Sequence, residues 1–377
     1  MTADVNKIAQ DAINVIAERI KNLNRLNIIV AGKTGVGKST LINAVFRDKM
    51  AETGIGRPVT DHMRKITKKG VPLCIYDTRG FELGKEVQND VKREIADTIS
   101  RGLAANDINE AVHCIWYCIN TASNRIEPEE IQWLREISRE NELTQVPIIV
   151  VLTQSFSEAN AQEMRKTLME ENLDIIQVVP VLAESYEIKG LGTAPAYGLD
   201  VLIQVMEEAL PEELMDTLQN VQIASLKSKK LRAQAAVATA ALAAAGEGAA
   251  PLPFADCAMM IPTQLGMIAS ITVIFGFNVS KSIITALLSS TIGSGGATVL
   301  GKTVVSNILK LIPGAGYVLG GAISAGTAGV ITAALGEAYI GVMELVFKGD
   351  MSLDDLSTSK GREAMKKLFR RKLKESE

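Results

Sequence analysis

The nine residues GKTGVGKST, from Gly32 to Thr40, constrain the fold of this chain more than any other segment. They fit the pattern GxxxxGK[ST], in which glycines let the backbone curl so that successive N–H groups point at phosphate oxygens. The match directly follows the β-rich run LNIIVA and precedes apolar residues at helical spacing, as this mechanism requires. The sequence therefore predicts a phosphate-binding loop between a strand and a helix. Its candidate nucleotide contacts are Gly32, Lys33, Thr34, Gly35, Val36, Gly37, Lys38, Ser39 and Thr40.

Further residues are expected beside the terminal phosphate. Lys38 should reach the β- and γ-phosphates, and the Ser39 hydroxyl should hold Mg²⁺. The motif DTRG begins at the last residue of the β-rich run VPLCIYD, which places the Asp77 carboxylate and the Gly80 N–H at the sheet edge near the γ-phosphate. Asp77 would hold Mg²⁺ through water. Asp and Gly mark turns in any protein, so the weight of this match comes from its place after a predicted hairpin.

The loop ETGIGRPVTDH, from Glu52 to His62, lies between these two motifs. It is polar and contains glycine and proline. Thr60 is the best candidate for a threonine that closes on Mg²⁺ and the γ-phosphate, and Thr53 is the second choice. An ordinary surface loop has the same composition, so the sequence leaves that alternative open.

Six short β-rich runs lie between Leu26 and about Pro211, and helical patterns separate most of them. This alternation predicts an α/β domain with a six-stranded, mostly parallel sheet. The early pair Met63–Thr67 and Val71–Asp77, joined by a KKG turn, predicts one antiparallel edge strand. The six runs are LNIIVA, MRKIT, VPLCIYD, AVHCIWYCI, PIIVVLT and IIQVVPVL.

The composition changes after Pro211, because only 8 of the 116 residues from Ala233 to Lys348 are charged. This change predicts a second, all-α apolar domain. We expect four parts: an N-terminal amphipathic helix over 1–25, the nucleotide-binding domain over 26–211, the apolar helical domain over 212–350, and a basic amphipathic tail over 351–377.

Three uncharged runs in the apolar part, 257–280, 282–301 and 311–336, are each long enough to cross a bilayer. Polar residues and proline interrupt the first run, and glycines loosen the second. The third is the best candidate, because small residues recur along it and let helices approach closely. A buried Ala/Gly-rich bundle has the same low charge, so this alternative also stays open.

The tail KGREAMKKLFRRKLKESE carries eight basic and three acidic residues. Its apolar residues fall on one helical face, with most of the basic residues opposite. This pattern is suited to an anionic lipid surface, and a solvated helix end is an equal alternative. The apolar face consists of Met365, Leu368, Phe369 and Leu373.

The composition also limits the partners that the chain can bind and the cellular compartment in which it is expected. The net charge of −3 gives the whole chain no electrostatic basis for wrapping nucleic acid. Its four cysteines lack CxxC spacing and are expected to be buried reduced thiols. Charged residues interrupt the N-terminal helix, so no secretory signal is expected and the chain should stay in the cytosol, peripheral or integral at the cytoplasmic membrane.

These motifs together resemble the Era-like branch of the translation-factor-related GTPases and, more loosely, the immunity-related and septin-like GTPases. The resemblance covers roughly Leu26 to Pro211 and rests on GKTGVGKS, on Thr60 in PVTDH and on DTRG. It implies GTP and GDP binding with Mg²⁺, and switch loops that order with the γ-phosphate. The apolar part resembles the YcjF-type hydrophobic domain of unknown function that follows such GTPase domains in bacterial proteins.

The chain departs from this family pattern after DTRG, where Phe81 stands in place of the glutamine that orients the attacking water. An apolar ring cannot orient water. Hydrolysis would then draw on Arg79 or Arg57, or on a second subunit or partner, and unaided turnover should be slow. Arg79 is equally compatible with a solvated surface position.

A second departure concerns the base. The family ends the corresponding strand with Asn/Thr-Lys-x-Asp, and this chain has TQSF, so the carboxylate that reads guanine is missing. Gln154 could lie along the base, and Thr153 could tie the loop to the phosphate loop. Glu158 or Glu184 is a substitute acceptor, and Ala183 and Glu184 occupy the family's last base-contacting loop.

The expected function is therefore a Mg²⁺-dependent GTPase whose nucleotide state controls an apolar helical domain. The apolar helical domain would engage an anionic membrane, another copy of itself, or both. A homodimer through the GTPase domain is a further expected partner arrangement. A scaffold with little turnover, a broad-specificity nucleoside triphosphatase and a pore-like membrane protein remain as alternatives.

Overall fold

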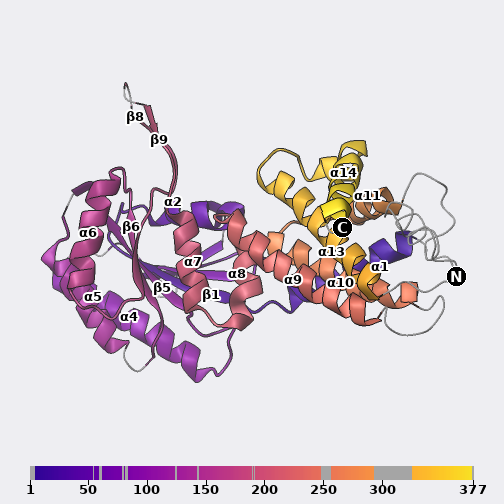
Figure 1. Cartoon of the computed structure of the whole chain (residues 1–377). Helices are drawn as coiled ribbons and strands as arrows, with labels where there is room; N and C mark the ends of the chain where they lie inside the picture. Colours follow the sequence, from indigo (N-terminus) through magenta and orange to yellow (C-terminus); the bar gives the residue numbers. More distant parts are fainter. Residues whose placement is uncertain are drawn as a thin grey trace. The chain divides into compact units, whose positions relative to one another are not determined.

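The structure is a computed structural model that divides the chain into two compact units, Leu23–Ser228 and Met1–Asn22 with Lys229–Glu377 (Figure 1). The boundary between them falls within the first turn of helix α9. The structure describes residues 5–53, 55–58, 62–78, 80, 84–123, 125–141, 144–188, 190, 192–247, 256–292 and 325–375.

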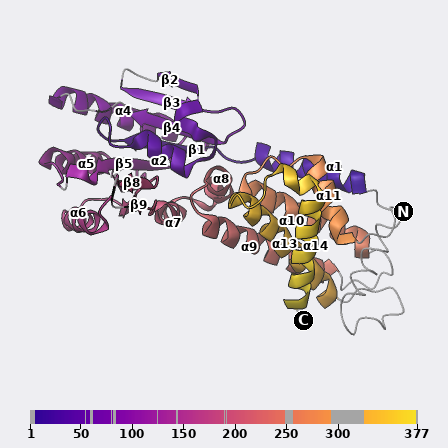
Figure 2. The same cartoon turned by 90° about the horizontal axis from the view of Figure 1, so that it is seen from above.

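The described strands of the first unit form a seven-stranded sheet in the order β2-β3-β4-β1-β5-β6-β7 (Figure 2). Strand β3 is antiparallel to both β2 and β4, and the other neighbours are parallel. All six predicted strands are present, which confirms the mostly parallel α/β fold. The strands are β1 Leu26–Ala31, β2 Ile55–Pro58, β3 Met63–Thr67, β4 Leu73–Thr78, β5 Cys114–Asn120, β6 Ile148–Thr153 and β7 Gln177–Pro180.

Strand β2 is an addition to the six predicted strands, since the segment from Glu52 to His62 was expected to be a loop. It pairs with β3 at the edge of the sheet, where Ile55 lies opposite Thr67. Its one proline, Pro58, is compatible with an edge position, because an edge strand leaves one row of backbone N–H groups unpaired.

Helices cover both faces of the sheet and bury its central strands (Figure 2). Along β5, Trp116 faces one apolar cluster and stacks on Phe46 with ring centroids 5.5 Å apart, while Tyr117 faces the other and stacks on Trp133 at 4.6 Å. A strand buried on both faces reads as a continuous apolar run, as CIWYCI does. The covering helices are α2 Lys38–Val45, α7 Leu199–Ala209 and α8 Met215–Val221 on one face, and α4 Gly84–Ala104, α5 Pro128–Glu140 and α6 Glu158–Glu170 on the other.

The first unit extends beyond the boundary expected at Pro211. Helix α8 follows the short helix η3 (Glu212–Leu214), and Leu214, Leu218 and Val221 are buried in the same cluster as the phosphate-loop helix α2. The chain therefore leaves this unit at Ser228. The remaining short elements are η1 Arg47–Lys49, α3 Met50–Thr53, η2 Thr121–Ser123, β8 Tyr186–Ile188 and β9 Gly192–Ala194.

In the described part of the second unit, every regular element is a helix, as the apolar composition predicted. The N-terminal helix α1 packs on α10 and α11 through Ala9, Ala12 and Ile16, so it belongs to this unit and is not a separate part. The helices are α1 Val5–Lys21, α9 Leu226–Glu247, α10 Asp256–Phe275, α11 Lys281–Ile292, α13 Ala325–Phe347, η5 Asp354–Ser357 and α14 Ser359–Glu375.

A buried lysine ties two of these helices together. Lys229 on α9 is fully buried, and its Nζ donates to the carbonyl oxygens of Ile274 and Phe275 at 2.8 and 3.4 Å. These carbonyls end α10 and have no partner within that helix, so the ammonium satisfies them and meets the negative end of the helix dipole. The ring of Phe347 lies 5.9 Å from the same Nζ.

Helix α13 is the one helix in the described ranges that is long and apolar enough to cross a membrane, by length and composition. It is also a core helix, because just over half of this stretch is buried and it carries polar contacts to α10. Tyr339 and Thr272 share a hydrogen bond of 2.8 Å, and Gln264 donates to Thr332 at 3.2 Å. Much of the second and third uncharged runs lies outside the described residues.

The basic tail is not a separate part, because α14 packs on α13 and α11. The apolar face of α14 lies in the core of the helical unit, because the side chains of Met365, Phe369 and Leu373 are at most 3% exposed. Leu368 packs over Gly341 of α13, where an added Cβ would lie 3.0 Å from its Cδ1. The sequence correctly separated an apolar from a basic face, but the apolar face meets neighbouring helices and is not free to enter lipid.

Two adjacent residues on α14 test this packing. Phe369→Ala should lower the unfolding free energy of the helical unit by about 3–5 kcal/mol, because it removes a buried ring and leaves a cavity. Arg370→Ala should change it by less than about 0.5 kcal/mol, because Arg370 is exposed. Thermal unfolding followed by far-ultraviolet circular dichroism measures both. Equal small effects would show that α14 does not pack as described.

Candidate functional site

The phosphate loop is held in shape by its contact with strand β5. Gly32 has φ 142°, and a Cβ at this position would lie 2.5 Å from the carbonyl oxygen of Cys118. A side chain would therefore collide with backbone, which cannot give way. Gly37, with φ 97°, then turns the chain into α2, which begins at Lys38. The N–H groups of the loop and of the first helical turn are placed to meet an anion.

Lys38 lies along the inside of this loop. Its Nζ donates to the carbonyl oxygens of Gly32 at 2.8 Å and of Lys33 at 3.0 Å. The ammonium is thus held beside the backbone that would surround a phosphate. Lys33 points elsewhere and pairs with the buried Glu130 of α5 at 3.5 Å.

The Asp77 carboxylate is the second charged group at this corner of the sheet. Strand β4 runs parallel to β1 with Asp77 opposite Val30, two residues before Gly32. Burial raises the pKa of the Asp77 carboxyl, and the positive charges of Lys38 and Arg64 partly offset this shift. Its Oδ1 is buried and has no hydrogen-bond partner among the residues the structure describes.

An unpaired buried carboxylate oxygen is costly unless a cation or water meets it. The residues at this corner therefore fit Mg²⁺, which prefers oxygen ligands and retains several waters. Ser39 lies exposed in the first turn of α2 and offers its hydroxyl as a second ligand. Thr60, the third predicted ligand, lies outside the described residues.

Gly80 of the DTRG motif lies directly on the phosphate loop. A Cβ added to Gly80 would be 1.9 Å from Thr34 Oγ1 and 2.2 Å from Thr34 N. Glycine is required here because the two backbones approach this closely. The structure therefore brings the two sequence motifs together at Thr34 and Gly80, which are 46 positions apart in the chain. Arg79 and Phe81 lie outside the described residues, and Arg57 is described only in its backbone within β2.

At the end of β6, Thr153 fastens the phosphate loop to the sheet. It is 3% exposed, and its Oγ1 hydrogen-bonds to the carbonyl oxygens of Val36 and Ile119, the latter at 3.1 Å. Gln154 follows with φ 52°, and its Nε2 donates to Gly35 O at 3.1 Å. Thr153 thus ties the end of β6 to the phosphate loop, as the sequence predicted, and Gln154 contacts the same loop, while its predicted place along the base stays a prediction.

The end of β5 contributes residues that the sequence analysis missed. Asn120 Nδ2 donates to Gln154 Oε1 at 3.2 Å, and Thr121 Oγ1 donates to Gln154 O at 2.9 Å. These contacts hold Gln154 from the opposite side to Gly35. The available signal was a polar residue at the carboxyl end of an apolar strand, which is where ligands bind in open α/β sheets.

The position of the missing carboxylate is apolar in the structure. Phe156 is 40% exposed and packs on Tyr186, which is 53% exposed, with ring centroids 4.8 Å apart. Tyr186 begins the β8–β9 hairpin, which projects from the sheet in Figure 1. Ser155 is buried and donates to Leu152 O at 2.8 Å, so its hydroxyl is already engaged. The structure shows no carboxylate in place of the family's aspartate among these residues.

The two residues predicted for the last base-contacting loop follow β7. Ala183 is partly buried against the core, and Glu184 is exposed. Leu182 is bridged to Tyr197, whose hydroxyl donates to Ser155 O at 2.9 Å. This contact brings the β7 loop beside the end of β6, although Tyr197 was not predicted. Glu158, the other candidate acceptor, begins α6 after the Ser157 N-cap.

Three of the four cysteines are buried reduced thiols, as expected, and the side chain of Cys257 lies outside the described residues. Cys74, Cys114 and Cys118 are buried free thiols. Burial raises the pKa of Cys74 to about 11 and that of Cys118 to about 12, so these thiols stay protonated and unreactive at neutral pH.

Comparisons with known proteins agree with this architecture. Residues 27–154 match the family model described as 50S ribosome-binding GTPase, and residues 213–373 match the model described as a domain of unknown function, DUF697. The chain thus carries a P-loop GTPase domain followed by a domain of unknown function.

Its relatives include septins and a chloroplast translocase. Human Septin-12 is 27% identical over 180 residues, covering 40% of this chain and 48% of Septin-12. Rat Septin-9 is 30% identical over 138 residues, covering 30% and 24%. Translocase of chloroplast 90 from Arabidopsis thaliana is 40% identical over 78 residues, covering 20% and 10%. The chain therefore spans less than half the length of each of these three relatives.

Two solved structures are similar at low identity. Cdc11 from Saccharomyces cerevisiae is 17% identical, with a TM-score of 0.32, covering 52% of this chain and 95% of that one. Toc33 from Arabidopsis thaliana is 15% identical, with a TM-score of 0.34, covering 59% and 96%. The family models and the curated relatives support a GTPase domain related to septins and chloroplast translocases, and they do not support the more specific Era-like and YcjF-type assignments.

Replacing the Thr153 hydroxyl tests how the loop is fastened. Thr153→Val keeps the shape but removes the one hydroxyl proton that is shared between Val36 O and Ile119 O, so the first unit should lose about 1–3 kcal/mol of unfolding free energy. Thr167→Val on the exposed face of α6 is the matched control. Both tryptophans, Trp116 and Trp133, lie in this unit, so urea unfolding followed by tryptophan fluorescence reports on it alone. Equal stability of the two variants would contradict the assignment.

Replacing Asp77 should affect the stability of the nucleotide-free protein and its Mg²⁺-dependent nucleotide affinity in opposite directions. Asp77→Asn removes the charge of a carboxylate that burial disfavours and whose Oδ1 has no hydrogen-bond partner among the described residues, so the nucleotide-free protein should be as stable as the wild type or more stable. The same variant should lose most of the increase in nucleotide affinity that Mg²⁺ gives. Asp97→Asn on the exposed face of α4 should change neither quantity. A Mg²⁺ dependence that survives in Asp77→Asn would remove Asp77 from the metal site.

Proposed function

We propose that this chain binds GTP and GDP with Mg²⁺, hydrolyses GTP, and uses its nucleotide state to control the helical unit in membrane association or self-assembly. The observation that carries this proposal is the corner where Lys38, the Asp77 carboxylate and Gly80 lie beside the phosphate loop, with Asp77 Oδ1 lacking a partner among the described residues. The relatedness of the domain to septin and chloroplast translocase GTPases supports guanine nucleotide as the ligand.

The proposed roles follow from position. Lys38 binds the β- and γ-phosphates, and the backbone from Gly32 to Thr40 surrounds them. Ser39, Thr60 and Asp77 hold Mg²⁺, which neutralises charge on the phosphate oxygens when it is bound. Gly80 offers its N–H to the γ-phosphate. Because Gly80 already touches Thr34, a γ-phosphate contact at Gly80 would be transmitted directly to DTRG and the segment that follows it.

The source of the hydrolytic group is part of the proposal. Phe81 takes the place of the water-orienting glutamine, so turnover by the isolated chain should be slow. Arg79 in the same chain, Arg57, or a residue from a second copy in a homodimer of the GTPase domain supplies the missing group. An arginine that reaches the transferring phosphoryl group accelerates related enzymes by about 10³–10⁵.

Base recognition rests on amides and hydroxyls. Gln154 is held between Gly35 and Asn120, and Ala183 and Glu184 border the same end of the sheet. Without the family's aspartate, the site lacks a charged bidentate acceptor worth about 2–3 kcal/mol of discrimination. We therefore propose a preference for GTP over ATP that is weaker than in GTPases with that aspartate. A cytoplasmic location, peripheral or integral at the cytoplasmic membrane, completes the proposal.

A nucleotide panel tests this function. The wild-type chain should bind GTP and GDP with Mg²⁺ more tightly than ATP and release phosphate slowly from GTP. Lys38→Ala should weaken GTP binding by about 10- to 150-fold, because it removes a charge-assisted hydrogen bond worth roughly 1.5–3 kcal/mol. Lys166→Ala, an exposed residue of α6, is the control. Isothermal titration calorimetry and a phosphate-release assay measure these quantities.

Three outcomes would change the assignment. A chain that ignores every nucleoside triphosphate at millimolar concentration with Mg²⁺ ends the proposal. Binding without phosphate release, even at high protein concentration, favours a nucleotide-binding scaffold. Equal affinity for ATP and GTP favours a broad-specificity nucleoside triphosphatase.

A further inference from the structure

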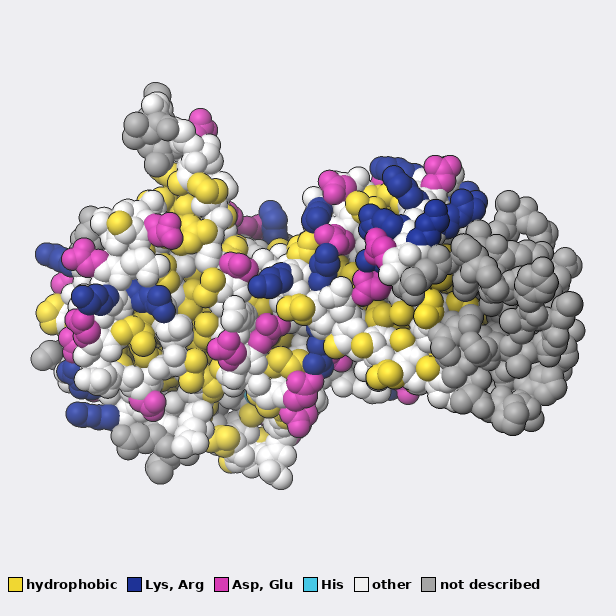
Figure 3. Space-filling model, in the orientation of Figure 1, with side chains coloured by type: hydrophobic (Ala, Val, Ile, Leu, Met, Phe, Trp, Pro, Cys, Tyr) yellow, Lys and Arg dark blue, Asp and Glu magenta, His cyan; other side chains and the backbone are white. Residues whose placement is uncertain are grey.

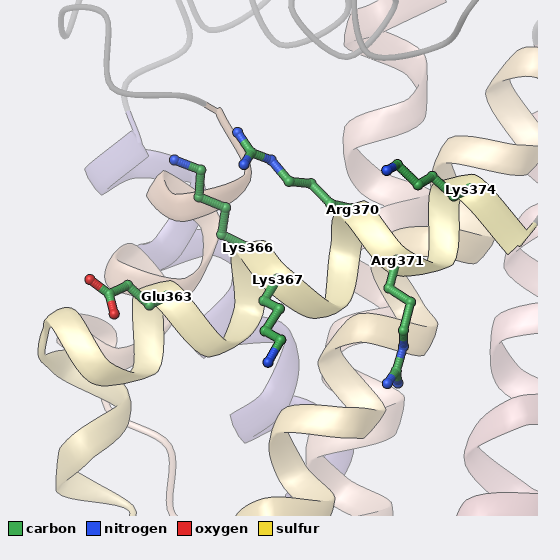
Figure 4. Close-up of a pocket in the computed structure, with 6 residues that line it drawn as sticks. All are labelled: Glu363, Lys366, Lys367, Arg370, Arg371 and Lys374. Carbon is green, nitrogen blue, oxygen red and sulfur yellow. The ribbon is translucent and has the colours of Figure 1, made fainter.

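Helix α14 presents a continuous basic face to solvent. Its five cations recur at three- and four-residue spacing over two turns, with one acidic residue at the start of the row (Figure 4). The row extends about 12 Å along the helix axis. In Figure 3, Lys and Arg side chains gather on this part of the surface. The residues are Lys366, Lys367, Arg370, Arg371 and Lys374, with Glu363 before them.

These cations are available to an external anion. Lys367, Arg370, Arg371 and Lys374 are exposed, and Lys366 is half-buried. Arg371 pairs with Glu375 at 3.6 Å, while the other four form no ion pair with any residue in the described ranges. A row of like charges on one face repels itself, so a polyanion that lies along it lowers the electrostatic free energy.

The opposite face of the helix decides how α14 can meet a membrane. An amphipathic helix that enters a bilayer buries its apolar face among the acyl chains. Here Met365, Phe369 and Leu373 are already buried against neighbouring helices. Contact with a membrane through α14 is therefore limited to the headgroups.

The same packing argues against a membrane-spanning role for α13 in this arrangement. Helix α14 lies along α13, and Lys372 of α14 approaches Glu337 of α13 at 3.9 Å. If α13 crossed the hydrocarbon core, the five cations of α14 would be carried toward it, and each charge placed there costs about 2.5–3.5 kcal/mol or more. The folded bundle is compatible with water and headgroups on this side.

We propose that the basic face of α14 is the membrane-docking surface of this protein, that it binds the phosphate groups of anionic lipids, and that the helical unit docks peripherally without α13 crossing the bilayer. This inference rests on the proposed function in membrane association and names its surface and mode. A single straight helix matches a flat layer of phosphates. The chain as a whole has a net charge of −3, so the positive charge is local to α14 and does not extend over a surface large enough to wrap a nucleic acid.

A charge-reversal pair tests the proposal on the full-length chain. Vesicles of phosphatidylglycerol and phosphatidylcholine are compared with vesicles of phosphatidylcholine alone by co-sedimentation, at low and high salt. Wild-type protein should bind the anionic vesicles, and high salt should release it. Lys366→Glu combined with Arg370→Glu should weaken binding at least about 30-fold, since each basic residue near such a surface contributes about fivefold.

The matched control is Lys227→Glu combined with Lys281→Glu, which reverses two exposed charges outside α14. Both double variants should keep the wild-type circular dichroism spectrum, GTP affinity and phosphate release. Loss of vesicle binding with nucleotide activity intact supports the docking surface. An α14 variant that binds vesicles as the wild type does overturns it, whether or not the protein binds GTP.

Three other results would also overturn the proposal. Equal binding to neutral vesicles would show apolar insertion. Resistance of bound protein to extraction at alkaline pH and high salt would show a spanning helix. Tighter binding to duplex RNA than to anionic vesicles at equal phosphate concentration would assign the basic face to nucleic acid.

Discussion

The candidate site depends on how closely the phosphate loop approaches the sheet. Gly32 lies against the carbonyl oxygen of Cys118 in β5, and the Thr153 hydroxyl of β6 bonds to Val36 O. The loop is therefore held from both sides by contacts within the protein, which lower the ordering free energy that ligand binding would cost. Lys38 and Asp77 acquire their positions from this frame, and the electrostatics of the corner follow from it. Burial disfavours the Asp77 charge, while the nearby ammonium of Lys38 favours it.

The base side of the site is built from different chemical groups than the phosphate side. Its contacts are neutral: Gln154 is held between Gly35 O and the Asn120 amide, and the aspartate position is an aromatic ring, Phe156, packed on Tyr186. The proposed phosphate site is built from backbone and charge, whereas the proposed base site has no charged acceptor at the TQSF positions Thr153 to Phe156. Because the two sides of the site use different groups, nucleotide affinity and preference for the base can vary independently.

In the helical unit, one helix combines core and surface functions. The apolar face of α14 completes the packing of α13 and α11, and its basic face remains in solvent. A pattern of apolar and basic residues cannot by itself tell a helix that inserts into lipid from a helix that covers a protein core, because both need the same amphipathic spacing. The contacts made by Phe369 and Leu373 decide between them. Lys229 is a second example, because its sequence context does not show that this lysine is buried and donates to a carbonyl oxygen at the end of α10.

The sequence alone determined the strand–loop–helix unit around GKTGVGKST, the six main strands and the all-helical character of the described part of the apolar region. These features depend on local periodicity and on backbone chemistry within short segments, which are written directly in the sequence. Only the tertiary structure decided that α1 packs with α10 and α11, that the first unit ends at Ser228, that β2 extends the sheet, and that Asn120 and Tyr197 meet the end of β6. Each of these depends on contacts between residues far apart in the chain, and no local pattern specifies which partner a buried face will find.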